Sequence, residues 1–183
     1  AQTDLAIFYS DNFIVLWQRT LRSIGGTINN VGDNARLFAL SEIAAIDSII
    51  SSWNTKKFYN FWRPQTAITL GETDGNSRTA GDPNWLPFLP TPPYPDYTSG
   101  ANNLTGSITR TLERLLGDKT TFSVFSTPAN RTITYDRFSD MADDVVDVRI
   151  YQGIHFRFAD DVGRRQGTHV ADWAVSHFLR PLN

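Results

Sequence analysis

The stretch YPDYTSGANNLTGSITRTLERLL, from Tyr94 to Leu116, combines two kinds of sequence. Its first half is rich in proline, tyrosine, serine and glycine, whereas its second half has helical spacing of apolar residues, at Leu104, Ile108, Leu112, Leu115 and Leu116. We therefore expect a rigid turn that passes into a helix at Ser99-Gly100. The free N–H groups at the start of such a helix favour anion binding.

The rest of the chain is predominantly of helical type. Asp11, Asp33 and Ser139 are candidate N-caps. The strongest pattern has apolar residues at Leu37, Leu40, Ile43, Ala44, Ile46, Ile50 and Trp53. Helices are predicted over 11–24, 33–57, a short segment after Arg63-Pro64, 100–116, 138–156 and 159–179. Residues 71–98 hold six of the nine prolines and predict a long ordered loop, and 121–125 with 131–135 predict a small β-hairpin. The predicted fold is an all-α helical bundle with one proline-rich loop.

Length and charge limit the class of protein. The 183 residues fit one domain, 1–183, and the net charge of −2 gives no electrostatic case for nucleic acid. The sequence contains no transmembrane segment and no cysteine, so we expect a soluble chain without disulfides. Sequons at Asn103 and Asn130 would imply secretion if they carry glycans; the compartment is otherwise unassigned. Aromatic residues in the loop would suit a homo-oligomer interface.

Three short segments carry candidate chemistry. Lys56 and Arg63 are two helical turns apart and would share a face, although a solvated basic edge has the same spacing. Arg149 and His155 are separated by Gly153, which permits a break that would turn the imidazole toward Arg149; the alternative is a structural histidine. If the helices bring these groups to the Ser99-Gly100 turn, a tetrahedral oxyanion would compensate the gathered cations.

The order of these segments resembles the type 2 phosphatidic acid phosphatase and vanadium haloperoxidase superfamily. Lys56, six residues and Arg63-Pro64 resemble its first motif, Ser99-Gly100 the core of its second, and Arg149, five residues and His155 its third. The resemblance is to the soluble haloperoxidase-like branch and its C-terminal catalytic half. It implies a helical bundle in which His155 is the catalytic residue and the metal ligand of vanadate. The oxyanion, vanadate or phosphate in its place, would be bound by Lys56, Arg63, Ser99, Gly100 and Arg149.

The chain departs from these motifs at four places. The second motif has Ala101 in place of its histidine and Thr98 in place of its proline. The third has Val148 for serine and Ala159 for aspartate, with Asp160 one position late. Losing a positioned acid–base group lowers a rate by roughly 10²–10⁴-fold. Oxyanion affinity should therefore be retained better than turnover, and the partner that orients His155 is left unassigned.

The sequence leaves three functions open. The first is halide oxidation by hydrogen peroxide, with activity weakened at Ala101. The second is an acid phosphatase that uses His155 as nucleophile on a phosphate ester. The third is a catalytically degenerate oxyanion-binding or structural, self-associating protein. In the first two cases the partner is a small-molecule substrate.

Overall fold

The computed structural model describes residues 1–180 and confirms the predicted all-α architecture with a small hairpin. The last three residues of the expected domain lie outside this described part. The helices are α1 (Gln2–Phe8), α2 (Phe13–Gly25), α3 (Val31–Tyr59), α4 (Pro64–Thr69), α5 (Gly100–Leu116), α6 (Phe138–Tyr151) and α7 (Arg157–His177), and Gly71–Thr73 forms a 3₁₀ turn. Strands β1 (Phe122–Ser126) and β2 (Arg131–Tyr135) pair antiparallel, with Val124 opposite Ile133.

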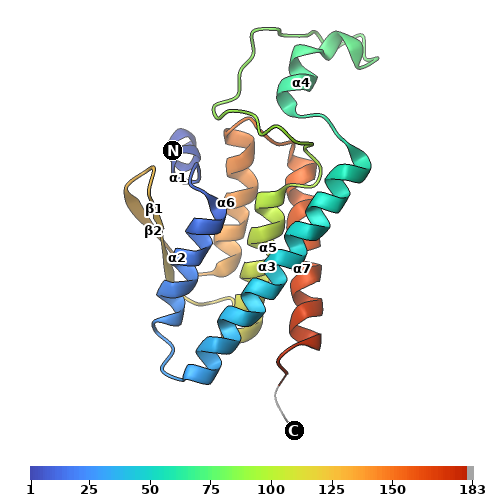
Figure 1. Cartoon of the computed structure of the whole chain (residues 1–183). Helices are drawn as coiled ribbons and strands as arrows, with labels where there is room; N and C mark the ends of the chain where they lie inside the picture. Colours follow the sequence, from blue (N-terminus) through green and yellow to red (C-terminus); the bar gives the residue numbers. More distant parts are fainter. Residues whose placement is uncertain (181–183) are drawn as a thin grey trace.

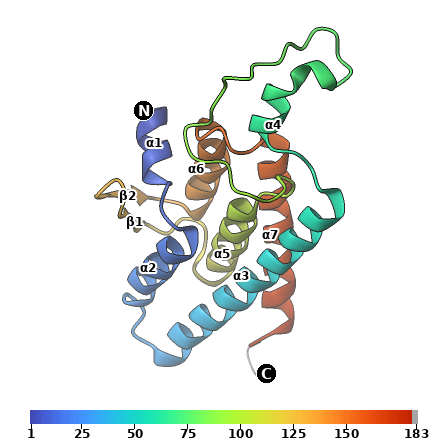
Figure 2. The ribbon, with the colours of Figure 1, turned by 45° about the horizontal axis from the view of Figure 1, so that its top comes forward.

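Helix α5 is the centre of the bundle. It packs against α3, α6 and α7, while α4 and the proline-rich loop lie over the end of the bundle where α5 begins (Figures 1 and 2). The hairpin packs against α2, and α1 packs against α6. The N-terminal end of α5 therefore points at the loop, which places the predicted anion-binding turn under a cover.

Glycines allow α5 and α7 to approach closely. A Cβ atom on Gly167 would lie 2.1 Å from the Asn103 carbonyl oxygen, and one on Gly106 would lie 2.5 Å from the Arg164 carbonyl oxygen. Both distances are shorter than any van der Waals contact, so no larger residue fits at either position without separating the helices. This close contact fixes the part of α7 around Arg164 and Gly167 against the first half of α5.

Several helix starts differ from the prediction. The N-cap of α2 is Asn12, not Asp11: its side chain accepts hydrogen bonds from the N–H groups of Ile14 and Val15 at 3.0 and 3.2 Å. The N-cap of α3 is Asn30, three residues before the predicted Asp33. An asparagine side chain caps as well as an aspartate does, so the sequence pattern could not choose between neighbours.

The start of α6 is set from outside the helix. Ser139 does not cap it; instead the Asp118 carboxylate accepts hydrogen bonds from the Ser139 N–H at 2.9 Å and hydroxyl at 3.0 Å. The helix begins at Phe138, the first residue of the predicted range, and ends at Tyr151 rather than continuing to 156. Helix α1 was not predicted, because its seven residues are too short to show a period.

The long helix α3 has one buried face and one apolar face that is exposed. Leu37, Leu40 and Ala44 are buried, whereas Ile46, Ile50 and Trp53 are 57, 60 and 48% exposed. The apolar period that predicted this helix therefore includes residues that no other element covers in its second half. Apolar periodicity marks a helix but does not say which of its residues another element covers.

The structure bears on the expectations about membrane insertion and glycosylation. No helix within residues 1–180 has the length and hydropathy to cross a membrane. Asn103 is fully buried and its side-chain amide donates to the Thr98 hydroxyl at 3.0 Å, so the folded chain cannot present this sequon to a glycosylating enzyme. Asn130 lies exposed in the hairpin turn.

Candidate oxyanion site

The motif residues come from helix ends that the sequence terminates locally. Lys56 lies in the last turn of α3, which stops at Asn60 in the left-handed conformation (φ 43°). Arg63 is the N-cap residue of α4, with Pro64 at the first helical position. Gly153, at φ 73°, reverses the backbone after the end of α6, and this reversal brings His155 to the same side as Arg149, as predicted.

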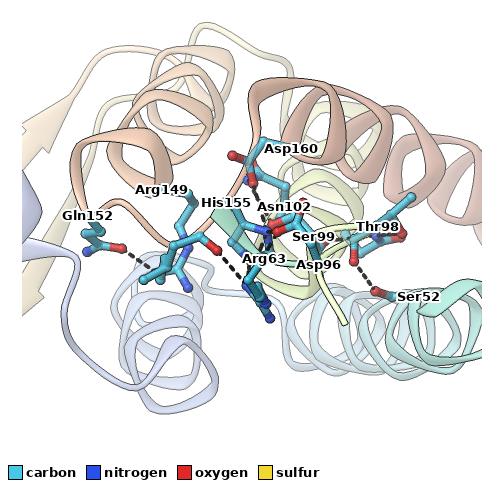
Figure 3. A network of polar contacts seen from close by, with 12 residues as sticks. Ser52, Arg63, Asp96, Thr98, Ser99, Asn102, Arg149, Gln152, His155 and Asp160 are labelled. Carbon is cyan, nitrogen blue, oxygen red and sulfur yellow. Dashed lines mark hydrogen bonds and ion pairs between the residues drawn. The ribbon is translucent and has the colours of Figure 1, made fainter. Parts of the chain in front are cut away.

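Arg63, Arg149 and His155 converge near the N-terminal end of α5 (Figure 3). Arg63 Nη1 lies 3.1 Å from His155 Nε2, and both side chains are almost completely buried. A cavity of about 230 Å³ adjoins them, lined on its polar side by Lys56, Arg149 and His155 and by Gly100 at the start of α5. The three predicted cations and the imidazole thus share one place in the fold, and the alternatives of a solvated basic edge and an isolated structural histidine do not describe it.

Main-chain carbonyls of the proline-rich loop hold two of the cations. Lys56 Nζ donates to the carbonyl oxygens of Pro95 and Asp96, both at 2.7 Å. Arg63 Nε donates to the carbonyl of Tyr94 at 2.9 Å, and the Tyr94 ring lies within cation–π distance of both charged groups. Prolines restrict the backbone conformation of this segment, so its carbonyl groups face the two cations before any anion binds.

Arg149 approaches from the opposite side. Its guanidinium lies over the ring of Phe13, 5.2 Å from the centroid, and donates to the Gln152 side chain at 2.6 Å. Gln152 in turn donates to the carbonyl of Ala6 in α1. Helices α1 and α2, which carry none of the predicted motifs, therefore support the third cation.

Ser99 lies behind the cavity wall in this structure. Its Oγ accepts hydrogen bonds from the Asn102 backbone and side-chain N–H groups at 3.4 and 3.2 Å, and its own N–H donates to the Ala159 carbonyl at 3.0 Å. Gly100 and Ala101 line the cavity instead, and their N–H groups belong to the first turn, where helix geometry leaves donors free. Among the residues described, the turn faces the cavity through its backbone rather than through the serine hydroxyl.

Two buried carboxylates accompany the cations, and sequence reasoning missed their role. Asp96 Oδ1 lies 2.6 Å from His155 Nδ1 and 3.6 Å from Arg63 Nη1. Asp160 Oδ1 lies 4.0 Å from the same imidazole nitrogen and accepts a hydrogen bond from the Asn102 amide at 2.8 Å. The protein itself thus supplies part of the negative charge that we expected only from a bound oxyanion. No motif spacing marks Asp96, which lies in the loop.

Burial dominates the ionisation of the site. It lowers the pKa of Lys56 to about 7 and that of Arg149 to about 10, and nearby cations contribute to both. It raises the pKa of Asp96 to about 6 and that of Asp160 to about 8. Burial, followed by the charges of the three cations, also lowers the pKa of His155 well below its ordinary value, so the imidazole is neutral at pH 7.

The donor set fits a tetrahedral oxyanion. Arg63 Nη2 and Arg149 Nε are buried and have no hydrogen-bond partner within residues 1–180. Unpaired buried N–H groups on guanidinium ions are costly, and an oxyanion supplies the acceptors that would satisfy them. Vanadate and phosphate have the same shape and acceptor oxygens, so these residues do not distinguish the two.

The wall opposite the charged groups is apolar and also was not predicted. It is formed by side chains of α2, α3, the loop and α5, namely Phe13, Ile14, Ile49, Trp53, Tyr94 and Leu104. Ala101 lines the cavity where the resembling family has its second-motif histidine. The apolar period of these helices is visible in the sequence, but which element covers the cavity is decided by tertiary packing.

Comparison with known proteins places this arrangement in a family. Residues 36–183 match the family described as the VCPO second helical-bundle domain. Vanadium chloroperoxidase of Curvularia inaequalis is 36% identical over 99 residues, which cover 48% of this chain and 15% of that protein.

Solved structures agree with the family match. A bacterial vanadium-dependent iodoperoxidase superposes with a TM-score of 0.69 at 30% identity, over 79% of this chain and 33% of that one. A bacterial vanadium-dependent chloroperoxidase has a TM-score of 0.60 at 20% identity, over 74% and 34% of the two chains, and supports the fold alone. This chain spans about a third or less of the length of these proteins, and it belongs to the family of the VCPO second helical-bundle domain.

Proposed function

We propose that the chain binds vanadate in the cavity at the start of α5 and supports halide oxidation by hydrogen peroxide, weakly because of Ala101. The observation that carries the proposal is the convergence of Lys56, Arg63 and Arg149 on His155, with two buried guanidinium N–H groups that have no partner among residues 1–180. The relatives named as vanadium-dependent haloperoxidases support the same assignment. Phosphate would occupy the site in place of vanadate.

Each residue of the site has a proposed task. His155 would hold vanadate through Nε2, and the three cations would neutralise the oxyanion. The Gly100 N–H adds a hydrogen bond, and Ser99, set behind the wall, orients the turn through Asn102. When bound, vanadate supplies Lewis-acid activation of peroxide for oxidation of a halide. The apolar wall excludes water from this side of the cavity, which strengthens the electrostatic interactions of the cations.

We treat residues 1–183 as one functional domain in this proposal. Helices α1 and α2 precede the region that matches the family, yet Phe13 and Ile14 line the cavity, and Gln152 links Arg149 to α1. Removal of residues 1–30 should therefore loosen Arg149 as well as open the cavity.

The test measures binding and turnover separately. Purified protein is titrated calorimetrically with orthovanadate and with phosphate, and bromination of a phenolic dye is followed with peroxide and bromide, with and without vanadate. Lys56→Met removes one cation, and Lys57→Met removes its exposed neighbour as a matched control. Loss of a charge-assisted hydrogen bond costs about 1.5–3 kcal/mol, so Lys56→Met should weaken oxyanion binding roughly 10- to 150-fold, and the control should not.

Turnover is tested by restoring the missing group. Ala101→His places an imidazole on the cavity wall and should raise vanadate-dependent bromination by roughly 10²–10⁴-fold. Absence of oxyanion binding in the natural chain, or equal binding by the two lysine variants, would overturn the assignment of the pocket.

A phosphatase is the second candidate. His155 lines the cavity and its buried imidazole is neutral, which suits a nucleophile toward phosphorus. An aryl phosphate needs little protonation of its leaving group, so it is the appropriate substrate for a site without a general acid. Hydrolysis of an aryl phosphate that vanadate inhibits, without bromination, would favour this candidate over the haloperoxidase.

A further inference from the structure

We propose that Asp96 is a positioning residue for His155: it holds a proton on Nδ1 and so leaves Nε2 as the ring nitrogen that carries the lone pair. This inference deepens the proposed function and rests on it for the task of Nε2. Asp96 lies in the proline-rich loop that precedes α5, whereas His155 lies between α6 and α7.

Arg63 Nη1 lies close to both ring nitrogens, 3.1 Å from Nε2 and 3.5 Å from Nδ1, and a guanidinium group can only donate hydrogen bonds. Nε2 is the nearer nitrogen and the better placed to accept, which requires that it carries no proton. The same Nη1 donates to the Ile154 carbonyl at 2.7 Å, so the guanidinium is held in place independently of the ring.

The closest neighbour of Nδ1 is a hydrogen-bond acceptor. The Asp96 carboxylate oxygen Oδ1 lies 2.6 Å away, and a carboxylate is an acceptor. Two lone pairs at that distance would repel, so the proton of the neutral ring belongs on Nδ1. The contact is close but lacks the alignment of a directed hydrogen bond, since Asp96 Oδ1 has no such partner in the described chain. Arg63 and Asp96, whose Nη1 and Oδ1 atoms lie 3.6 Å apart beside the ring, thus favour the same tautomer.

The other carboxylate is not in a position to do this. Asp160 Oδ1 is 4.0 Å from Nδ1, beyond hydrogen-bonding distance, and is already bonded to the Asn102 amide. Ala159, one residue earlier, has no acceptor in its side chain. The orienting partner that the third motif lacks is therefore found in the loop.

The backbone of Asp96 is fixed on both sides of its carboxylate. Its N–H donates to the Phe61 carbonyl at 2.9 Å and its own carbonyl accepts from Lys56 Nζ at 2.7 Å. The side chain is fully buried. A residue held in this way presents its carboxylate in one direction, as a positioning residue must.

Nitrogen-15 NMR of the imidazole rings tests the inference without vanadate, peroxide or halide. The chain has three histidines, and His155→Gln assigns the signals of His155. In the natural chain we expect His155 to carry its proton on Nδ1 and none on Nε2. Asp96→Ala should move the two nitrogen shifts toward each other as both tautomers become populated. Asp96→Asn offers an amide oxygen at the same place and should restore the natural pattern.

Asp160→Asn is the matched control and should leave the His155 signals unchanged. A natural chain with the proton on Nε2 would overturn the inference, as would an Asp96→Ala spectrum identical to the natural one. The wild-type and Asp96→Asn spectra keep the test decisive if the alanine variant does not fold. Because the readout is the tautomer, failure of oxyanion binding would count against the proposed function and not against this inference.

Discussion

Replacement of Lys56 by methionine should change how stability depends on pH. The ammonium group of Lys56 is 1% exposed, and burial lowers its pKa from 10.5 to about 7. The unfolded chain keeps the ordinary value, so between pH 7 and 10.5 the unfolded state binds more protons than the folded state. The natural chain therefore gains stability as pH rises through this window, and Lys56→Met, which has no proton to release, does not.

The size of the effect follows from the two pKa values. The gap between 10.5 and about 7, at about 1.36 kcal/mol for each pH unit, corresponds to about 5 kcal/mol as an upper bound. Between pH 6 and pH 10 the part that is realised is about 4 kcal/mol. Loss of the two hydrogen bonds to Pro95 and Asp96 shifts the variant by a constant amount and does not alter the slope.

Urea unfolding followed by tryptophan fluorescence at pH 6, 7, 8, 9 and 10 measures this difference. Titrating groups distant from Lys56 are common to both proteins and cancel when one curve is subtracted from the other, whereas the charge of Lys56 also acts on the pKa values of Asp96 and His155. Lys57→Met, with its side chain exposed, should show a flat difference from the natural chain. A flat difference for Lys56→Met as well would refute the reasoning, because it would mean that Lys56 keeps an ordinary pKa and is not buried in the folded protein.

Three further outcomes follow from contacts described above. Gly167→Ala places a Cβ 2.1 Å from the Asn103 carbonyl and should lower the free energy of unfolding by about 3 kcal/mol or more, whereas Gly100→Ala, whose Cβ meets nothing within 3.9 Å, should change it by less than about 1 kcal/mol in urea unfolding. Tyr135→Phe removes two buried hydrogen bonds at 2.7 and 2.6 Å and should cost about 1–3 kcal/mol, measured by thermal unfolding; an unchanged melting temperature would contradict this. At pH 8, Asp96→Asn removes a negative charge from the cation cluster and should tighten phosphate binding by about 1–3 kcal/mol in calorimetry, so weaker binding would show that its charge does not oppose the anion.

The sequence was sufficient to predict that the cations meet. Lys56 and Arg63 do meet, but not as two turns of one helix as expected, because α3 ends at Tyr59 and Arg63 is the N-cap of α4. Gly153 permitted the reversal that brings His155 and Arg149 to one cavity, an inference that uses only backbone geometry. The order of helices, the proline-rich loop and the hairpin followed from periodicity and turn residues in the same way.

The features that the sequence did not reveal all depend on contacts between distant segments. Asp96 looked like one more polar residue in a loop, and only the folded chain places its carboxylate 2.6 Å from His155. The cap of α6 by Asp118 spans 21 residues, and the cavity wall from Phe13 comes from a helix without any motif. Local patterns carry no information about such pairings, because nothing in a window of ten or twenty residues depends on them.

Three successive peptide groups, at Tyr94, Pro95 and Asp96, grip Lys56 and Arg63 through oxygens that every amino acid possesses. The grip is therefore insensitive to the identity of most side chains in the segment and sensitive to the course of its backbone. Two proteins can differ at most positions of this loop and still bind both cations through the same main-chain oxygens. The sequence identity of the loop would then understate how similar the two sites are. An insertion or deletion of a single residue there would do more harm than many substitutions.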